Sequence, residues 1–169
     1  MLNLGPALQR LRPLRHLRHL RRLRHLRHLL PRWRRAGGPH AAARVPPGLD
    51  VDEFLRLARF SFVRLQAAWD AADLATLERL ATGPLLADLR EQLQARGAGL
   101  NRTDVLQLQA QLLAFEELRD AFVASVEFSG LIQEGADAAA TEFRELWLLT
   151  KLKPHGGEAW QLAQMQALA

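Results

Sequence analysis

Apolar residues recur with the period of an α-helix at the start of the region that follows residue 48. The residues of this pattern are four and three positions apart in alternation: Val51, Leu55, Ala58, Phe62, Leu65 and Trp69. Such spacing places all of them on one helical face. Asp50 and Glu53 stand at the N-cap and third positions of a capping box. The pattern therefore predicts a helix from Val51 to about Ala71.

Three further large apolar residues lie in the same stretch but beside that face: Phe54, Leu57 and Phe60. A helix with one apolar stripe needs only one packing partner, whereas a wider apolar surface needs more. We therefore expect this helix to be covered on more than one side.

Two shorter helices are predicted between this helix and residue 97. Asp73 is placed to cap the first of them, and Thr82 to Pro84 end it and begin the second, because proline favours the first turn of a helix. Gly97 is placed to end the second helix. The residues expected to face inward are Leu74, Leu77 and Leu80 in the first helix and Leu85, Leu86, Leu89 and Leu93 in the second.

From residue 104 onward the apolar period changes from that of a helix to that of a strand. Apolar and polar residues alternate in four segments: 104–113, 121–130, 142–152 and 159–168. A period of two is typical of a strand that buries one face, and segment 154–157 predicts a hairpin turn. Helices followed by antiparallel strands make an α+β fold. We expect the helices to pack on a curved four-stranded antiparallel sheet, leaving a cone between them.

Charge divides the chain into two unlike parts. Residues 1–48 contain twelve arginines and no acidic residue, whereas residues 49–169 contain eleven Lys and Arg against eighteen Asp and Glu, a net charge of −7. Segment 36–48 is rich in Gly, Pro and Ala, as linkers are. The predicted organisation is an Arg/Leu/His-rich leader (residues 1–35, helical or disordered), a linker (36–48) and one folded domain (49–169).

The leader repeats leucine at every third position from Leu8 to Leu29. Three hypotheses remain open for it: a disordered low-complexity tail, an anchor on anionic membrane, or a contact with the backbone of RNA or DNA. Trp33 is its only aromatic residue, so it offers no stacking platform for bases, and nucleic acid is the less favoured partner. The arginines expected to contact an anionic surface, here called the nine leader arginines, are Arg15, Arg18, Arg21, Arg22, Arg24, Arg27, Arg32, Arg34 and Arg35.

The composition excludes several kinds of site. The chain has no cysteine, which rules out disulfides, thiolate metal sites and cysteine nucleophiles. Four leader histidines have no carboxylates beside them to orient metal ligands, so we expect neither a metal nor another cofactor: His16, His19, His25 and His28. The longest uncharged runs are eleven residues, whereas a membrane-spanning helix needs at least ~18.

Two carboxylates on predicted strands are the candidates for acid–base chemistry. Glu127 or Glu145 would act as a general base if it faced the interior of the cone. Strand carboxylates usually face solvent, and the only histidine of residues 49–169 is His155, in the predicted turn. We therefore expect no catalytic residue and no enzyme activity.

Five blocks of sequence, taken in order, carry a resemblance to a known family: DVDEFL (50–55), FSFVRLQAAWD (60–70), NRTDV (101–105), VEFSGLI (126–132) and LWLLTK (146–151). Together they resemble the bacterial Tim44-like domain over about residues 49–168. The resemblance implies an NTF2-like, cone-shaped α+β domain with an apolar pocket. In mitochondria, relatives are membrane-peripheral. One tethers a chaperone motor to the protein import channel, one is a ribosomal protein, and their early helices contact cardiolipin-rich membrane.

The apolar cone and the resemblance together make seven residues candidates for lining an acyl-chain pocket, although core packing would give the same pattern: Phe62, Trp69, Phe122, Val126, Phe128, Trp147 and Trp160. Outside the cone, four arginines are expected on a solvated helix face that could extend the leader's contact with an anionic surface: Arg56, Arg59, Arg64 and Arg79. The pocket and the basic surfaces are the candidate binding sites.

The expected function is a non-enzymatic, membrane-peripheral binding or scaffold domain. Its leader would adsorb to anionic lipid, and its pocket would accept a lipid tail or an apolar segment of a protein partner. This interpretation implies a bacterial protein at the cytoplasmic face of the inner membrane or in the cytoplasm. The alternatives are a ribosome- or RNA-associated factor held by its basic leader and a small NTF2-like enzyme.

Overall fold

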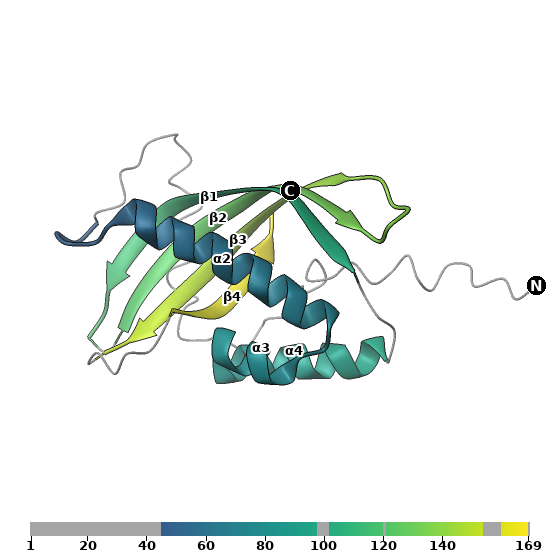
Figure 1. Cartoon of the computed structure of the whole chain (residues 1–169). Coiled ribbons are helices and arrows are strands. Elements are labelled where there is room, and N and C mark those ends of the chain that lie inside the picture. Colours follow the sequence, from purple (N-terminus) through teal and green to yellow (C-terminus); the bar gives the residue numbers. More distant parts are fainter. Residues whose placement is uncertain (1–44, 98–101, 120, 154–159, 169) are drawn as a thin grey trace, which may run out of the picture.

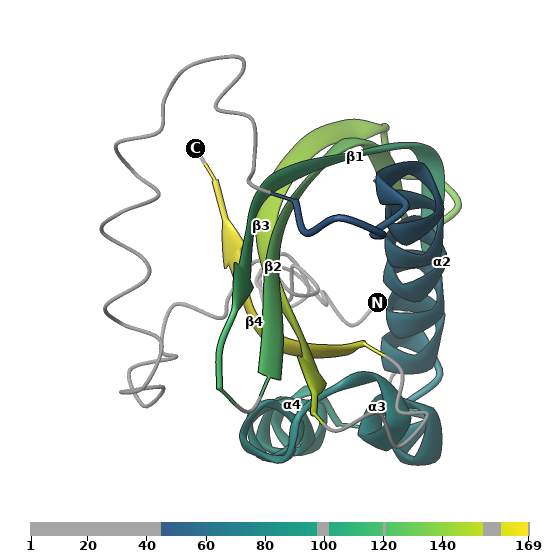
Figure 2. The same ribbon diagram turned by 90° about the vertical axis from the view of Figure 1, so that its left-hand side faces the viewer.

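The computed structural model of the chain describes residues 45–97, 102–119, 121–153 and 160–168. Along this part run three helices and then four strands: α2 (Val51–Asp70), α3 (Leu74–Leu80), α4 (Gly83–Arg96), β1 (Thr103–Glu117), β2 (Ala121–Glu134), β3 (Thr141–Leu152) and β4 (Gln161–Ala167). The strands form one antiparallel sheet in the order β1-β2-β3-β4. In both views the helices lie on one side of the curved sheet (Figures 1 and 2).

This arrangement confirms the predicted α+β fold, in which N-terminal helices pack on a curved four-stranded antiparallel sheet. The predicted leader, most of the linker and the predicted turn at 154–157 lie outside the described residues. Their expected structures therefore stay predictions.

The helix ends follow the capping residues that the sequence offers. The Asp50 carboxylate accepts the Glu53 backbone N–H at 3.0 Å, and the Asp73 carboxylate accepts that of Thr76 at 3.1 Å. Only half of the predicted capping box forms, because the Glu53 carboxylate pairs with Arg56 at 2.6 Å. Gly97 ends α4 with a φ of 76°, a conformation that costs glycine little.

Helix α2 is covered on one side only, which corrects one expectation. Ala58, Phe62, Leu65 and Trp69 of the predicted face are at most 4% exposed. The expected second cover is wrong, since Leu57 is 43% and Phe60 58% exposed. The reason is tertiary: the sheet and the other described helices lie against one side of α2 (Figure 2), and in the described ranges nothing packs on the opposite side.

Three shifts of strand register alter which residues of the alternating pattern face the core. Val105 pairs with Ile132 and Gln107 with Leu131, so the register shifts at Leu106, and Leu106 is 51% exposed. A second shift in β1 lies between Leu112 and Ala114, and in β4 a third shift lies opposite Leu148 and Leu149. The shift in β4 brings Leu162 and Met165, which belong to different alternating sets of the sequence, into the same core. An inserted residue reverses the facing of a strand from that point onward.

Candidate functional site

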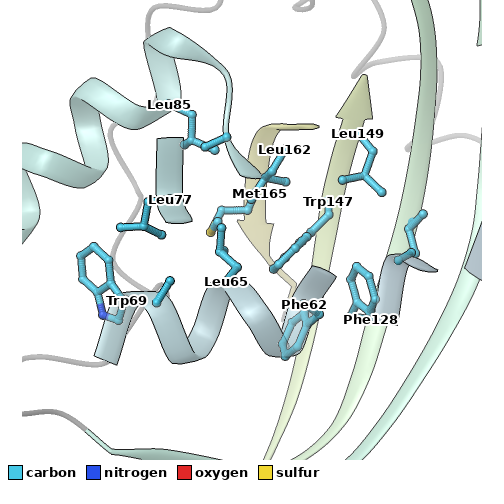
Figure 3. Close-up of a cluster of buried hydrophobic side chains, with 14 of the residues drawn as sticks. Phe62, Leu65, Trp69, Leu77, Leu85, Phe128, Trp147, Leu149, Leu162 and Met165 are labelled. Atoms are coloured by element: carbon cyan, nitrogen blue, oxygen red, sulfur yellow. The ribbon is translucent and has the colours of Figure 1, made fainter. Parts of the chain in front are cut away.

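Three aromatic rings fill the space between α2 and the centre of the sheet (Figure 3). The ring centroid of Phe62 lies 4.9 Å from those of Phe128 and Trp147, and these two are also 4.9 Å apart. Phe143 stacks on Phe62 at 5.4 Å. With Val126, the three rings are at most 2% exposed. Four of the seven predicted pocket residues are thus brought together in the core, and their role in lining a cavity stays a prediction.

The other predicted pocket residues lie at the two ends of the helix. Phe122 and Trp160 are half-buried and belong to a cluster near the start of α2. In that cluster Phe54 meets Trp160 at 5.1 Å, and Phe115 lies 5.9 Å from both Phe122 and Trp160. Trp69 is buried near the C-terminal end of α2 beside Leu77 (Figure 3). The seven residues therefore do not form one wall, and the more open aromatic end is the one at Phe122 and Trp160.

Glu145 faces the interior, against the expectation that strand carboxylates point to solvent. It pairs across the sheet with Phe128 and is 6% exposed. The Trp147 indole Nε1–H donates to its carboxylate at 2.9 Å. A buried carboxylate needs such donors, because burial without them is costly. Residue 145 belongs to the same alternating set as Phe143, Trp147 and Leu149. This shared set was the signal in the sequence that Glu145 would face the interior.

Glu127, in contrast, lies on the face of the sheet turned away from the helices. Its carboxylate forms a bidentate pair with Arg144 at 2.8 and 3.0 Å, which raises the pKa of the Arg144 guanidinium. Of the two carboxylates considered for acid–base chemistry, only Glu145 therefore meets the requirement of facing inward.

A group of polar contacts that was not predicted from the sequence joins α2 to α4 and β1. The Arg96 guanidinium donates to the backbone oxygens of Trp69 at 2.8 Å and Asp70 at 3.4 Å, and it lies 5.4 Å from the centroid of the Trp69 ring. These bonds satisfy carbonyls that the end of a helix leaves free. The Asp70 carboxylate accepts the backbone N–H of Thr103 at 2.6 Å, where β1 begins. No local sequence pattern links residues so far apart.

Replacing Asp70 by asparagine should change how stability depends on pH. Burial raises the pKa of the Asp70 carboxyl above its ordinary value of 3.8, although the bonds from Thr103 oppose this. The folded state thus holds the proton more readily than the unfolded state, so this group stabilises the fold at low pH and the contribution is lost as pH rises through the raised pKa. Asparagine does not titrate, so urea unfolding across that window should show the parent losing stability relative to Asp70→Asn as pH rises. A stability difference that stays constant with pH would contradict the assignment.

The exposed side of α2 combines apolar and basic side chains. Its apolar residues Leu57, Phe60 and Val63 are 43%, 58% and 45% exposed, and their spacing of three places them along one strip of the helix. The Arg64 guanidinium lies 5.6 Å from the centroid of the Phe60 ring, and Arg59 is half-buried beside the strip. Neither arginine has an ion-pair partner among the described residues. We call Leu57, Phe60, Val63, Arg59 and Arg64 the α2 strip.

The predicted basic leader falls outside the described part of the chain. The nine leader arginines lie in the part that the structure does not describe. Within the described ranges, no group of three or more acidic residues and histidines is arranged to hold a metal ion. Nor is any helix in those ranges long and apolar enough to cross a membrane.

The sequence profile of the Tim44-like domain matches residues 35–167. Among solved structures, the chain is similar to a ketosteroid isomerase-like protein from Erwinia carotovora atroseptica, with 11% identity over 68% of this chain and 96% of that one and a TM-score of 0.38. It is also similar to the intermembrane space region of the chloroplast protein ARC6, with 14% identity over 73% and 99% of the two chains and a TM-score of 0.44. No curated protein matches it significantly.

The two solved structures are too distant to say anything about activity. The profile match carries more, because it spans most of the sequence and contains all five blocks in which the resemblance lies. The chain belongs to the Tim44-like domain family.

Proposed function

We propose that the protein is a non-enzymatic, membrane-peripheral binding domain that docks on anionic lipid through the α2 strip and its basic leader. The observation that carries the proposal is the strip itself, where a phenylalanine that is 58% exposed lies among exposed apolar residues and two arginines without described ion-pair partners. Exposed apolar residues that form a continuous strip mark interaction surfaces. Arginines beside such a strip favour a negatively charged interface, at ~1 kcal/mol for each one adsorbed.

The aromatic interior supplies the second part of the proposal. An acyl chain or an apolar segment of a partner would enter at the half-buried end, where Phe122 and Trp160 lie. Glu145, held by the Trp147 indole, is then a structural group of the core. Native mass spectrometry of the full chain should show a retained apolar ligand. Protein that carries no ligand in repeated preparations, even after mild extraction, would refute the proposal that the aromatic interior binds one.

Replacing Phe60 by aspartate should weaken binding to anionic vesicles about tenfold to a hundredfold, because burying a large apolar side chain contributes ~1.5–3 kcal/mol. Co-sedimentation of the full chain with vesicles of anionic and of neutral lipid measures the effect. The matched control is Leu106→Asp, since Leu106 is exposed to a similar degree (51%) but lies on the bulge of β1. Equal loss in both variants would mean that α2 is not the contact.

The same experiment separates the leader from the strip and lipid from nucleic acid. Replacing the nine leader arginines by glutamine in the full chain should weaken vesicle binding and its dependence on salt. The leader variant and Phe60→Asp could both bind vesicles as the parent does. If the leader variant then also dissociates from ribosomes or RNA at a moderate salt concentration at which the parent stays bound, the alternative of an RNA-associated factor would replace the proposal.

A further inference from the structure

The sheet has a second face, which we call the outer face, turned away from α2, α3 and α4 (Figure 2). Successive residues of a strand point to opposite faces. Because Val126 and Trp147 face the helices, their neighbours Ser125 and Leu148, which pair with each other, face outward. Gln164, which pairs with Leu148 across the next pair of strands, lies on the same face, as does Val123 two residues before Ser125.

The centre of the outer face is buried although no described helix or strand lies over it. Val123 is 2%, Ser125 0% and Leu148 4% exposed. Farther along the same face, Arg144 on β3 and Gln109 on β1 are exposed, so the burial is confined to one patch. An uncovered sheet face does not hide a serine and a leucine so completely, since their side chains stand away from the sheet.

Two polar atoms in this patch also lack partners. The Ser125 hydroxyl oxygen and the Gln164 side-chain oxygen are buried without a hydrogen bond. Buried polar atoms are nearly always bonded, so each such exception needs an explanation. Both atoms can accept hydrogen bonds, and a group that offers several N–H donors and no acceptor, as guanidinium does, would suit them. The patch therefore fits an occupant that presents both apolar side chains and arginines.

We propose that the leader, residues 1–35, packs across the outer face of the sheet. It has leucine at every third position between Leu8 and Leu29, eleven arginines and no acidic residue. The leucines would pack on Val123 and Leu148, and the guanidinium groups would donate hydrogen bonds to the side-chain oxygens of Ser125 and Gln164. The net charge of −7 on residues 49–169 attracts such a segment, and Glu116 pairs with Val123 at the border of the patch.

The leader has enough chain to reach this face. Thirteen residues, 36–48, join it to the domain, and at ~3.3 Å per extended residue they span about 40 Å, roughly the length of the longest strand of the sheet at a similar rise. The docked leader would hold its leucines and arginines away from lipid. Anionic membrane and the outer face would thus compete for it. This competition rests on the proposed function, whereas the docking does not.

Single thiols can test the docking in the full chain, which has no cysteine of its own. Ser125→Cys places a thiol in the patch with little change of shape, and Ser129→Cys is the matched control, four residues along β2 on the same face but only half-buried. We expect a maleimide to react with Cys at position 125 at least about tenfold more slowly than at 129, because a covered site reacts only when the cover opens. Replacing the nine leader arginines by glutamine should remove most of that difference.

Three other results would each overturn one part of the proposal. Protection at position 125 that persists with the glutamine leader would mean that the sheet's own side chains cover it, and docking would be refuted. Protection that disappears on dilution would assign the patch to a second copy of the chain instead. The thiol could become reactive when the nine leader arginines are replaced by glutamine, yet stay protected when anionic vesicles are added to the protein with its native leader. In that case the docking is supported and the proposed competition with lipid is refuted. Thermal unfolding of both cysteine variants should match that of the parent, which confirms that they fold.

Discussion

Replacing Trp147 by alanine should lower the free energy of unfolding by about 4 kcal/mol, a large part of the roughly 5–15 kcal/mol that stabilises a typical domain. Trp147 is 1% exposed, and its ring contacts those of Phe62 and Phe128 with centroids 4.9 Å away. The substitution removes this packing, leaves a cavity, and takes away the N–H that bonds the buried Glu145 carboxylate. Urea unfolding followed by circular dichroism measures the loss.

Trp147→Phe separates the two causes. Phenylalanine keeps an aromatic ring between Phe62 and Phe128 but has no N–H for Glu145, so we expect a loss of about 1–3 kcal/mol, the cost of leaving a buried polar group without one partner. A loss as large as that of the alanine variant would show that the hydrogen bond, and not the packing, dominates. Trp147→Phe combined with Glu145→Gln should then recover part of the stability, because an amide, which cannot ionise, costs less to bury without that donor than a carboxylate does.

Replacing Gly130 by alanine should destabilise the sheet by about 3 kcal/mol or more, because the backbone has no room for a side chain there. A Cβ at this position would lie 1.9 Å from the backbone oxygen of Gln107 and 2.6 Å from its carbonyl carbon, at a φ of +157°. Both obstacles are backbone atoms of the neighbouring strand, so β1 and β2 would have to separate beside the bulge at Leu106.

Gly83→Ala is the control for this variant. Gly83 begins α4, and a Cβ there would meet nothing within 4 Å. We expect stability to stay the same or to rise by up to about 1 kcal/mol, since alanine favours a helix over glycine. Equal destabilisation in the two variants would mean that loss of glycine flexibility, and not the close approach of the strands, is responsible. Urea unfolding of both proteins decides between these causes.

The helices could be predicted from sequence because their signals are local. The spacing of Ala58, Phe62 and Leu65 marked the buried face of α2, and Asp50 and Asp73 marked two helix starts, since a cap bonds a backbone group only three residues away. The same signals could not say how many sides of α2 are covered. Phe60 is as apolar as Phe62, and only the position of the sheet decides that one is exposed and the other buried.

The candidate sites depended on the tertiary structure to a greater degree. The parity that joins residue 145 to Trp147 was present in the sequence, but the general preference of carboxylates for solvent argued against it. The two aromatic groups, one around Phe62 and one around Trp160, appear only when strands distant in sequence are paired. The junction of Arg96 with Trp69 joins residues 27 positions apart, beyond the reach of any local pattern.

The sequence by itself determined the order of helices and strands, the family, and the charge difference between residues 1–48 and 49–169, because periodicity, caps and charge are read along the chain. Only the tertiary structure decided which apolar residues remain exposed, as on the α2 strip, and which polar ones are buried, as Ser125 and Glu145 are. Bulges shift the register of β1 and β4, and the single-sided packing of α2 fixes its exposed strip. Burial is a property of the neighbours that folding brings together, and those neighbours are not adjacent in the chain.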